Sequence, residues 1–176
     1  MDDISIKGLI EALLFVSPSP LTIDLIARIT QDYSKGEIRK AIDNLREEYK
    51  SLNRSFYIEE VAGGYQFRTR AEYTRWIRRL EGIKPPKLSK AALETLAVIA
   101  YKQPVIRTDI ESIRGVDVGG VLKTLLERHL IKIIGRKEIP GRPIVYGTTK
   151  EFLELFGLKD ISSLPTLKDV ERDGIE

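Results

Sequence analysis

Hydrophobic and polar residues follow the same order twice along this chain. Each copy of the pattern opens with an apolar segment that ends near a proline, Ile6 to Pro20 in the first copy and Leu88 to Pro104 in the second. A shorter segment follows in each copy, at 21–30 and at 105–114, with an aspartate near its start. Apolar residues at helical spacing predict helices in all four segments.

A third helix is predicted in each copy by apolar residues at positions i, i+4, i+7 and i+11. One buried face is therefore expected on each of these helices. The positions are Ile38, Ile42, Leu45 and Tyr49 in the first copy, and Val118, Leu122, Leu125 and His129 in the second.

Each third helix is followed by two short runs rich in β-branched and aromatic residues, separated by glycine-containing sequence. The runs cover 56–61 and 65–69 in the first copy, and 131–135 and 144–147 in the second. This composition and spacing predicts a β-hairpin in both places.

A capping box is predicted after each hairpin, at Thr69 with Glu72 and at Thr148 with Glu151. In such a box the hydroxyl and the carboxylate satisfy backbone N–H groups that are free at a helix start. Closing helices are therefore expected next. Their apolar positions also correspond, Tyr73, Trp76 and Ile77 in the first copy against Phe152, Leu155 and Phe156 in the second.

The repeated order favours an internal duplication over chance similarity of two helical hairpins. Three helices, a two-stranded wing and a closing helix are the elements of a winged helix domain, in which the third helix often reads nucleic acid. The predicted fold class is α+β, mainly α, with two tandem winged helix (winged helix-turn-helix) domains. The predicted parts are an N-terminal domain at 1–81, a proline-containing linker at 82–87, a C-terminal domain at 88–158 and an acidic, flexible tail at 159–176.

Composition excludes several kinds of site. The chain has no cysteine and one histidine, which excludes disulfides, thiolate zinc sites and histidine clusters. It has no glycine loop with lysine for phosphates and no serine, histidine and aspartate order that spacing supports, and His129 is interpreted as structural. No catalytic residue, cofactor or metal is therefore predicted.

The sequence also gives an expectation of location. No apolar run is long enough to span a bilayer, and the start Met1-Asp-Asp has the wrong charge for a secretory signal. A cytoplasmic protein without a membrane partner is expected.

Positive charge is concentrated in one region although the net charge is only +3. Phosphate contact and an ordinary solvated helix face both explain such a strip. Acidic residues on the first of the two third helices argue against base reading and favour protein binding. The basic strip consists of Arg68, Arg70, Arg75, Arg78, Arg79, Lys84, Lys87 and Lys90, with Glu72 and Glu81 among them.

Two long stretches of the second copy are not required by core packing, AVIAYKQPV at 97–105 and GRKEIPGRPIVYGTT at 135–149. Together with IRGV at 113–116 and LLER at 125–128, they resemble the segregation and condensation protein B family, ScpB. The resemblance extends from IKGLIEALLF at 6–15 to FLELFGL at 152–158. One departure is Val118-Gly119-Gly120, where the family pattern has a polar residue near the helix cap, and this leaves the first turn of that helix uncertain.

The resemblance implies a non-enzymatic, homodimeric subunit of the bacterial condensin complex. Such a subunit binds the kleisin ScpA, reaches the SMC ATPase through it, and supports chromosome condensation and segregation during cell division. It is associated with the nucleoid, and its contact with DNA is indirect or weak. A DNA-binding winged helix transcriptional regulator is the alternative that the bare fold permits.

Candidate interface residues follow from this family picture. The dimer is expected to use the opening helix of the first copy, although the same stripe also fits a core face. The kleisin is expected on the surface formed by the signature stretches, where Pro143 can instead shape a turn and Tyr146 can pack in the core. The dimer candidates are Ile6, Leu9, Ile10, Leu13 and Leu14, and the kleisin candidates are Tyr101, Gln103, Pro104, Arg114, Arg142, Pro143 and Tyr146.

Overall fold

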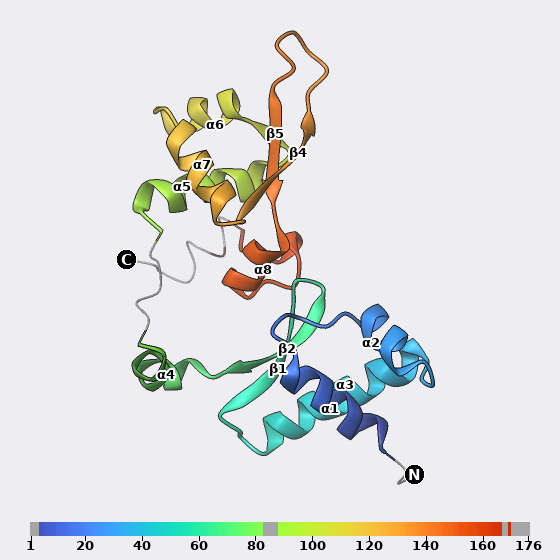
Figure 1. Ribbon diagram of the computed structural model, residues 1–176. Helices are drawn as coiled ribbons and strands as arrows, with labels where there is room; N and C mark the ends of the chain where they lie inside the picture. Colours follow the sequence, from blue (N-terminus) through green and yellow to red (C-terminus); the bar gives the residue numbers. More distant parts are fainter. Residues whose placement is uncertain (1–3, 83–87, 167–168, 170–176) are drawn as a thin grey trace. The chain divides into compact units, whose positions relative to one another are not determined.

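The computed structural model describes residues 4–82, 88–166 and 169 (Figure 1). The chain is mixed α/β, mainly helical, and divides into two compact units, 1–85 and 86–176. Most of the predicted linker at 82–87 lies outside the described residues, as does most of the predicted tail beyond 166.

Unit 1 opens with three helices, α1 (Ile6–Val16), α2 (Ile23–Thr30) and α3 (Lys35–Ser51). A hydroxyl side chain caps each of them, because Ser5, Thr22 and Ser34 accept backbone N–H groups of the first turn. At α3 the carboxylate of Glu37 accepts a hydrogen bond from the backbone N–H of Ser34. This bond completes a capping box that was not predicted from the sequence.

The hairpin of unit 1 pairs β1 (Phe56–Val61) with β2 (Gly64–Thr69) in antiparallel register, as predicted. An isolated bridge between Leu21 and Tyr65 adds the segment before α2 to this hairpin. Helices and hairpin together enclose one apolar core, to which every one of these elements contributes. Its fully buried members include Ile10, Ile26, Ile38, Ile42 and Leu45.

Tyr49 joins the end of α3 to both the hairpin and α1. Its ring packs against Phe56 and Phe67, and its hydroxyl donates a hydrogen bond to Glu11 of α1. Burial, followed by the Glu11 carboxylate, raises the pKa of Tyr49 to about 12. Tyr49 therefore connects the end of α3 to the hairpin and to α1.

The closing segment of unit 1 contradicts the predicted capping box. The chain forms the 3₁₀ turn η1 (Ala71–Tyr73) and then α4 (Thr74–Glu81), and neither begins with a side-chain cap. Thr69 is instead the last residue of β2, so its backbone is extended. None of the described side chains of α4 is buried.

Unit 2 repeats the order of elements (Figure 1). Its helices are α5 (Lys90–Lys102), α6 (Arg107–Arg114), α7 (Gly119–Glu127) and α8 (Lys150–Phe156), and a short 3₁₀ turn, η2 (Ile161–Ser163), follows. The hairpin consists of β4 (Ile131–Arg136) and β5 (Ile144–Thr148), with a register shift between Ile133 and Gly135.

The predicted start of the second helix at Val105 is wrong. Val105 and Ile106 form β3, which pairs with Tyr146 and Val145 of β5, so the sheet order is β3-β5-β4. The pairing of Val105 with Tyr146 corresponds to the bridge of Leu21 with Tyr65 in unit 1. The structural repeat is therefore more complete than the sequence pattern indicated.

The second predicted capping box is displaced by one residue. The hydroxyl of Thr149, not that of Thr148, accepts the N–H of Phe152 at 3.1 Å and caps α8. Phe152 is buried in the core of unit 2, whereas Tyr73, its counterpart in unit 1, is exposed. The closing helices therefore differ, because α8 is anchored in a core and α4 is not.

Helix α7 begins at Gly119, and its first turn is held by neighbouring side chains instead of its own cap. Asp117 accepts the N–H of Gly119 at 2.9 Å, and Glu111 accepts that of Val118 at 3.2 Å. Arg107 pairs with both carboxylates, at 2.5 Å to Asp117 and 2.7 Å to Glu111. Val118-Gly119-Gly120, where the sequence departs from the family pattern, is thus compatible with an ordered helix start.

Candidate partner-binding surfaces

Gln103 is the most connected of the predicted kleisin residues. Its side-chain oxygen accepts the backbone N–H of Thr148 at 2.7 Å, and its amide nitrogen donates to the carbonyl of Ala100 at 3.2 Å. A Cβ at Gly147 would lie 3.0 Å from the same oxygen, so glycine leaves the space for this contact. Gln103 therefore joins the end of α5 to β5, and its polar atoms are turned inward.

Tyr146 and Arg114 are also less accessible to a binding partner than expected. Tyr146 is only 8% exposed and belongs to the core of unit 2, so it leaves the candidate surface. The side chain of Arg114 is largely buried and forms an ion pair with Glu94 of α5. Both residues act within the unit, where they connect α5 to α6 and to the sheet.

Arg142 and Pro143 lie in the loop at the end of the β4–β5 hairpin, away from the helices in Figure 1. Arg142 pairs with Glu138 across this loop at 2.9 Å, and the carbonyl of Pro143 accepts the N–H of Lys137 at 2.9 Å. These contacts shape the loop. The structure does not bring this pair together with Tyr101 and Pro104, which lie at the end of α5.

Tyr101 faces an apolar groove that the sequence analysis did not identify. The groove has a volume of about 300 Å³ and lies between α5, α8 and residues 158–165. Its walls are almost entirely apolar, and Leu93, Tyr101 and Phe156 are exposed at its edge. The sequence of α5 does contain a pattern that indicates this groove, because the apolar residues Leu93, Ala97 and Tyr101 recur every four residues beside the buried stripe.

The predicted dimer stripe on α1 is mainly a core face. Ile10 and Leu14 are fully buried, and Ile6 and Leu13 pack against the same core, so only Leu9 remains partly open outside it. The exposed apolar side chains lie at the end of this helix, where Phe15 is 77% exposed and Val16 73%. A partner can reach this end, which we call the α1 end patch.

A second exposed apolar face lies on α4. Trp76 is 59% exposed and Leu80 88%, and Tyr73 and Ile77 share their side of the helix by i, i+3, i+4 and i+7 spacing. Arginines occupy other positions, with Arg75, Arg78 and Arg79 exposed. Such a helix buries its apolar face only against something outside its own unit's core.

The basic strip is spread over several elements. Arg68 and Arg70 are half-buried on and after β2, and Arg70 donates a hydrogen bond to the carbonyl of Arg54 at 2.7 Å. Lys90 stands at the start of α5 in unit 2, within reach of Glu94. Lys84 and Lys87 lie outside the described residues. The exposed cations are thus those of α4 and Lys90, and they belong to separate units.

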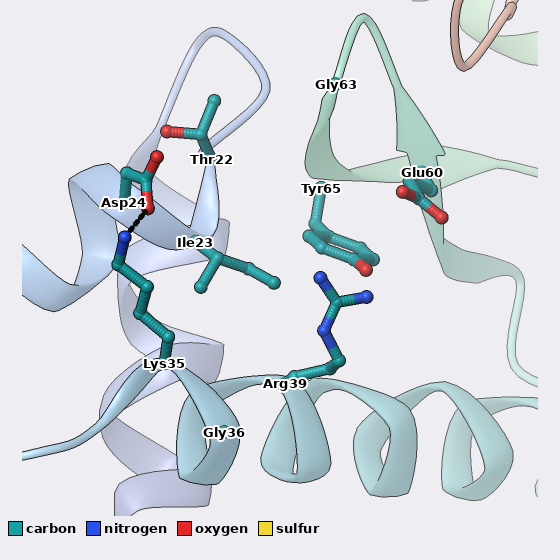
Figure 2. A pocket seen from close by; sticks show the side chains of 9 residues that line it. All are labelled: Thr22, Ile23, Asp24, Lys35, Gly36, Arg39, Glu60, Gly63 and Tyr65. Carbon is teal, nitrogen blue, oxygen red and sulfur yellow. Dashed lines mark ion pairs between the residues drawn. The ribbon is translucent and has the colours of Figure 1, made fainter.

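Unit 1 also has a polar cleft of about 420 Å³ between α2, the start of α3 and the hairpin turn (Figure 2). Lys35 pairs with Asp24 at 2.6 Å, and its hydrogen bond and charge lower the pKa of Asp24. Figure 2 shows the guanidinium of Arg39 beside the ring of Tyr65, and Glu60 lies opposite Tyr65 on the neighbouring strand β1. Charges of both signs line this cleft, so it offers no concentrated field for a single ion.

A metal centre is not built by these side chains. Among the residues that the structure describes, no three His, Asp or Glu side chains gather to hold a metal ion. His129 is exposed and follows the last turn of α7, with its carbonyl accepting the hydroxyl of Thr149 at 2.6 Å. The prediction that His129 lies on the buried face of the third helix is therefore wrong, because α7 ends at Glu127 and the side chain of His129 is exposed.

The chain consists of two small, mainly helical units, and exposed apolar faces such as theirs are typical of proteins that bind partners. The family model of the segregation and condensation complex subunit ScpB matches residues 8–167. The chain belongs to this family.

The relatives agree with the family model. A segregation and condensation protein B from Syntrophotalea carbinolica is 49% identical over 169 residues, which cover 96% of this chain and 85% of the relative. A crystal structure of ScpB from Mycobacterium tuberculosis is 34% identical, with a TM-score of 0.42, and covers 90% of this chain and 98% of its own. A dimer of an ScpB N-terminal domain complexed with an ScpA peptide is 25% identical, with a TM-score of 0.39, and covers 42% and 91%.

The family places the chain in chromosome segregation and condensation. In the described part of the chain, no helix has the length and apolar character that a membrane crossing requires.

Proposed function

We propose that this chain is a non-catalytic, homodimeric subunit of the bacterial SMC complex that binds the kleisin ScpA and supports chromosome condensation and segregation. The observation that carries the proposal is the family match over residues 8–167. The apolar faces exposed in both units supply surfaces for such partners. The subunit acts in the cytoplasm at the nucleoid, and it reaches SMC through the kleisin.

Each unit is interpreted as a winged helix domain, with α3 and α7 as the third helices and the two hairpins as wings. The order of elements and the matched bridges Leu21–Tyr65 and Val105–Tyr146 support this interpretation. Neither third helix gathers basic side chains without acidic neighbours, since α3 carries Glu37, Asp43, Glu47 and Glu48. Protein binding is thus favoured over base reading.

The homodimer is assigned to unit 1, through the α1 end patch and the apolar face of α4. Both surfaces are apolar. In a symmetric dimer, α4 of each copy can therefore pack on the α1 end patch of the other copy. Exposed side chains of this size contribute roughly 100 Å² each, so burying both surfaces in two copies removes on the order of 1,000 Å², near the lower limit for a specific dimer.

The dimer interface is tested by Trp76→Glu and Leu80→Glu. Each change places a charge in an apolar contact and should weaken dimerisation at least about 30-fold, the effect of losing one interface anchor of about 2 kcal/mol. Light scattering after size exclusion measures the mass, and circular dichroism checks the fold. Arg79→Glu is the matched control, because it changes charge on the same helix outside the apolar face.

The outcomes separate two claims. If both glutamate variants stay folded and dimeric, the interface lies elsewhere. If the unchanged protein is monomeric, the proposal of a homodimer is itself wrong. Leu14→Glu is unsuitable, because Leu14 is buried and a charge there would unfold unit 1.

The kleisin is assigned to unit 2, on the groove beside Tyr101. Calorimetry with the purified central segment of ScpA should give stoichiometric binding that changes little with salt. A transcriptional regulator would instead bind duplex DNA with sequence preference and a steep dependence on salt. Binding of DNA without binding of ScpA would contradict the proposed function and favour the regulator.

A further inference from the structure

Residues 158–166, which we call the C-terminal strap, cross the apolar groove of unit 2. Leu158 and Leu164 pack against the core of the unit, and Leu164 and Pro165 form part of the groove wall. The hydroxyl of Tyr101 donates a hydrogen bond to the carbonyl of Pro165 at 2.6 Å. The first half of the predicted flexible tail is therefore seated on the same surface as the candidate kleisin residue Tyr101.

Part of the strap is held by its own local contacts. Asp160 accepts the N–H of Ser162 at 2.9 Å, and the N–H groups of Ser163 and Leu164 bond to carbonyls within the strap. Ile161, Pro165 and Thr166 are exposed, and η2 buries none of its residues. Segments with few buried contacts open at low free energy.

The groove is only partly filled by the strap. A volume of about 300 Å³ remains, with Leu93 and Ala97 of α5 and Phe156 of α8 along it. The seated residues show which chemistry this surface accepts: a leucine side chain in an apolar wall, followed by a backbone carbonyl opposite the Tyr101 hydroxyl. A partner segment with the same features and a longer apolar contact can replace the strap.

We propose that the C-terminal strap is an internal competitor for the groove, and that the occupant it competes with is an extended, leucine-containing segment of ScpA. This inference rests on the proposed function, because it names how the partner docks there. The strap covers the groove in the free subunit and is displaced when the partner binds. Free subunits would then bind the partner more weakly than subunits whose strap is released.

The test compares full-length variants for ScpA binding by calorimetry. Leu164→Asp releases the strap and leaves the walls that α5 and α8 contribute to the groove unchanged, so affinity for the central segment of ScpA should rise about tenfold. Leu93→Arg places a charge at the groove edge and should lower affinity about tenfold or more. The matched controls are Ile161→Asp, an exposed position on the strap, and Ile113→Arg, an exposed apolar position on α6 outside the groove. Neither control should change the affinity.

Hydrogen exchange gives a second readout. Binding of ScpA should speed exchange at the amides of Ser163 and Leu164, whose bonds belong to the seated strap, and slow it at the end of α5. Slower exchange in the strap on binding, or unchanged affinity of Leu164→Asp, would overturn the competition.

The two proposals fail in different ways. If ScpA binds all variants equally, the strap proposal and the assignment of ScpA to the groove are both wrong, while the proposed binding of ScpA by this chain stands. If ScpA binds neither the unchanged protein nor Leu164→Asp, the proposed function falls, and the strap proposal falls with it.

Discussion

At the scale of single residues, Gln103 shows how a signature residue can act inside the fold. Its side chain joins the end of α5 to the backbone of Thr148, in a half-buried position where water cannot easily replace it. A residue of the signature stretch at 97–105 thus connects two elements within unit 2. The neighbouring Tyr101 differs, because it is 51% exposed.

Gln103→Ala should lower the stability of unit 2 by about 1–2 kcal/mol, because it leaves the N–H of Thr148 without its acceptor. Urea unfolding followed by circular dichroism measures the loss, and faster exchange at the Thr148 amide locates it. Lys102→Ala changes an exposed neighbour and serves as the control. Equal stability of Gln103→Ala and the unchanged protein would contradict the role assigned to this side chain.

At the scale of elements, α7 is held by contacts from outside the helix. Arg107, Glu111 and Asp117 secure its first turn, which begins with two glycines. The two glycines have different surroundings. A Cβ at Gly119 would lie 3.2 Å from the Arg107 guanidinium, whereas a Cβ at Gly120 would meet nothing within 4 Å.

Gly120→Ala should therefore stabilise unit 2 by about 0.5–1 kcal/mol, since alanine restricts the unfolded chain and fits the helix without crowding. Gly119→Ala should gain less, because the new methyl group displaces Arg107 from its carboxylates. Thermal unfolding of the two variants, measured side by side, checks the difference. A larger gain at Gly119 than at Gly120 would show that the ion pairs do not matter for α7.

At the scale of the whole molecule, the residues that the structure describes form two separate hydrophobic cores. One contains Ile42 and the other Leu125, and none of the described residues belongs to both clusters. Each core is small, and each unit leaves an apolar face exposed, which favours partners for both.

Leu125→Ala should destabilise unit 2 by about 2–5 kcal/mol, because it removes a fully buried side chain and leaves a cavity. Hydrogen exchange measured by mass spectrometry should then accelerate in α5 and α7 and stay unchanged in α1 and α3. Ile42→Ala is the reciprocal variant and should affect unit 1 alone. Equal acceleration in both units would show that the two cores unfold together.

Sequence periodicity determined the kind and order of most elements, although Val105 and Ile106 of β3 were predicted as part of a helix. The third helices and both hairpins lie where the spacing of Ile38, Ile42 and Leu45, and of Leu122 and Leu125, predicted them. Such patterns are local, because a helix or strand must place its apolar side chains on one face. The long signature stretches also indicated the family, which the match of the ScpB family model to residues 8–167 confirmed.

Only the tertiary structure decided which apolar positions are covered. Ile10 and Leu14 look like an interface stripe in sequence, yet they fill the core of unit 1, while Leu80 of α4 stays exposed. Likewise, Thr149 and not Thr148 caps α8, because Thr148 is bound to Gln103, 45 residues away in sequence. Burial and long-range hydrogen bonds depend on which elements meet in space, and no local pattern contains that information.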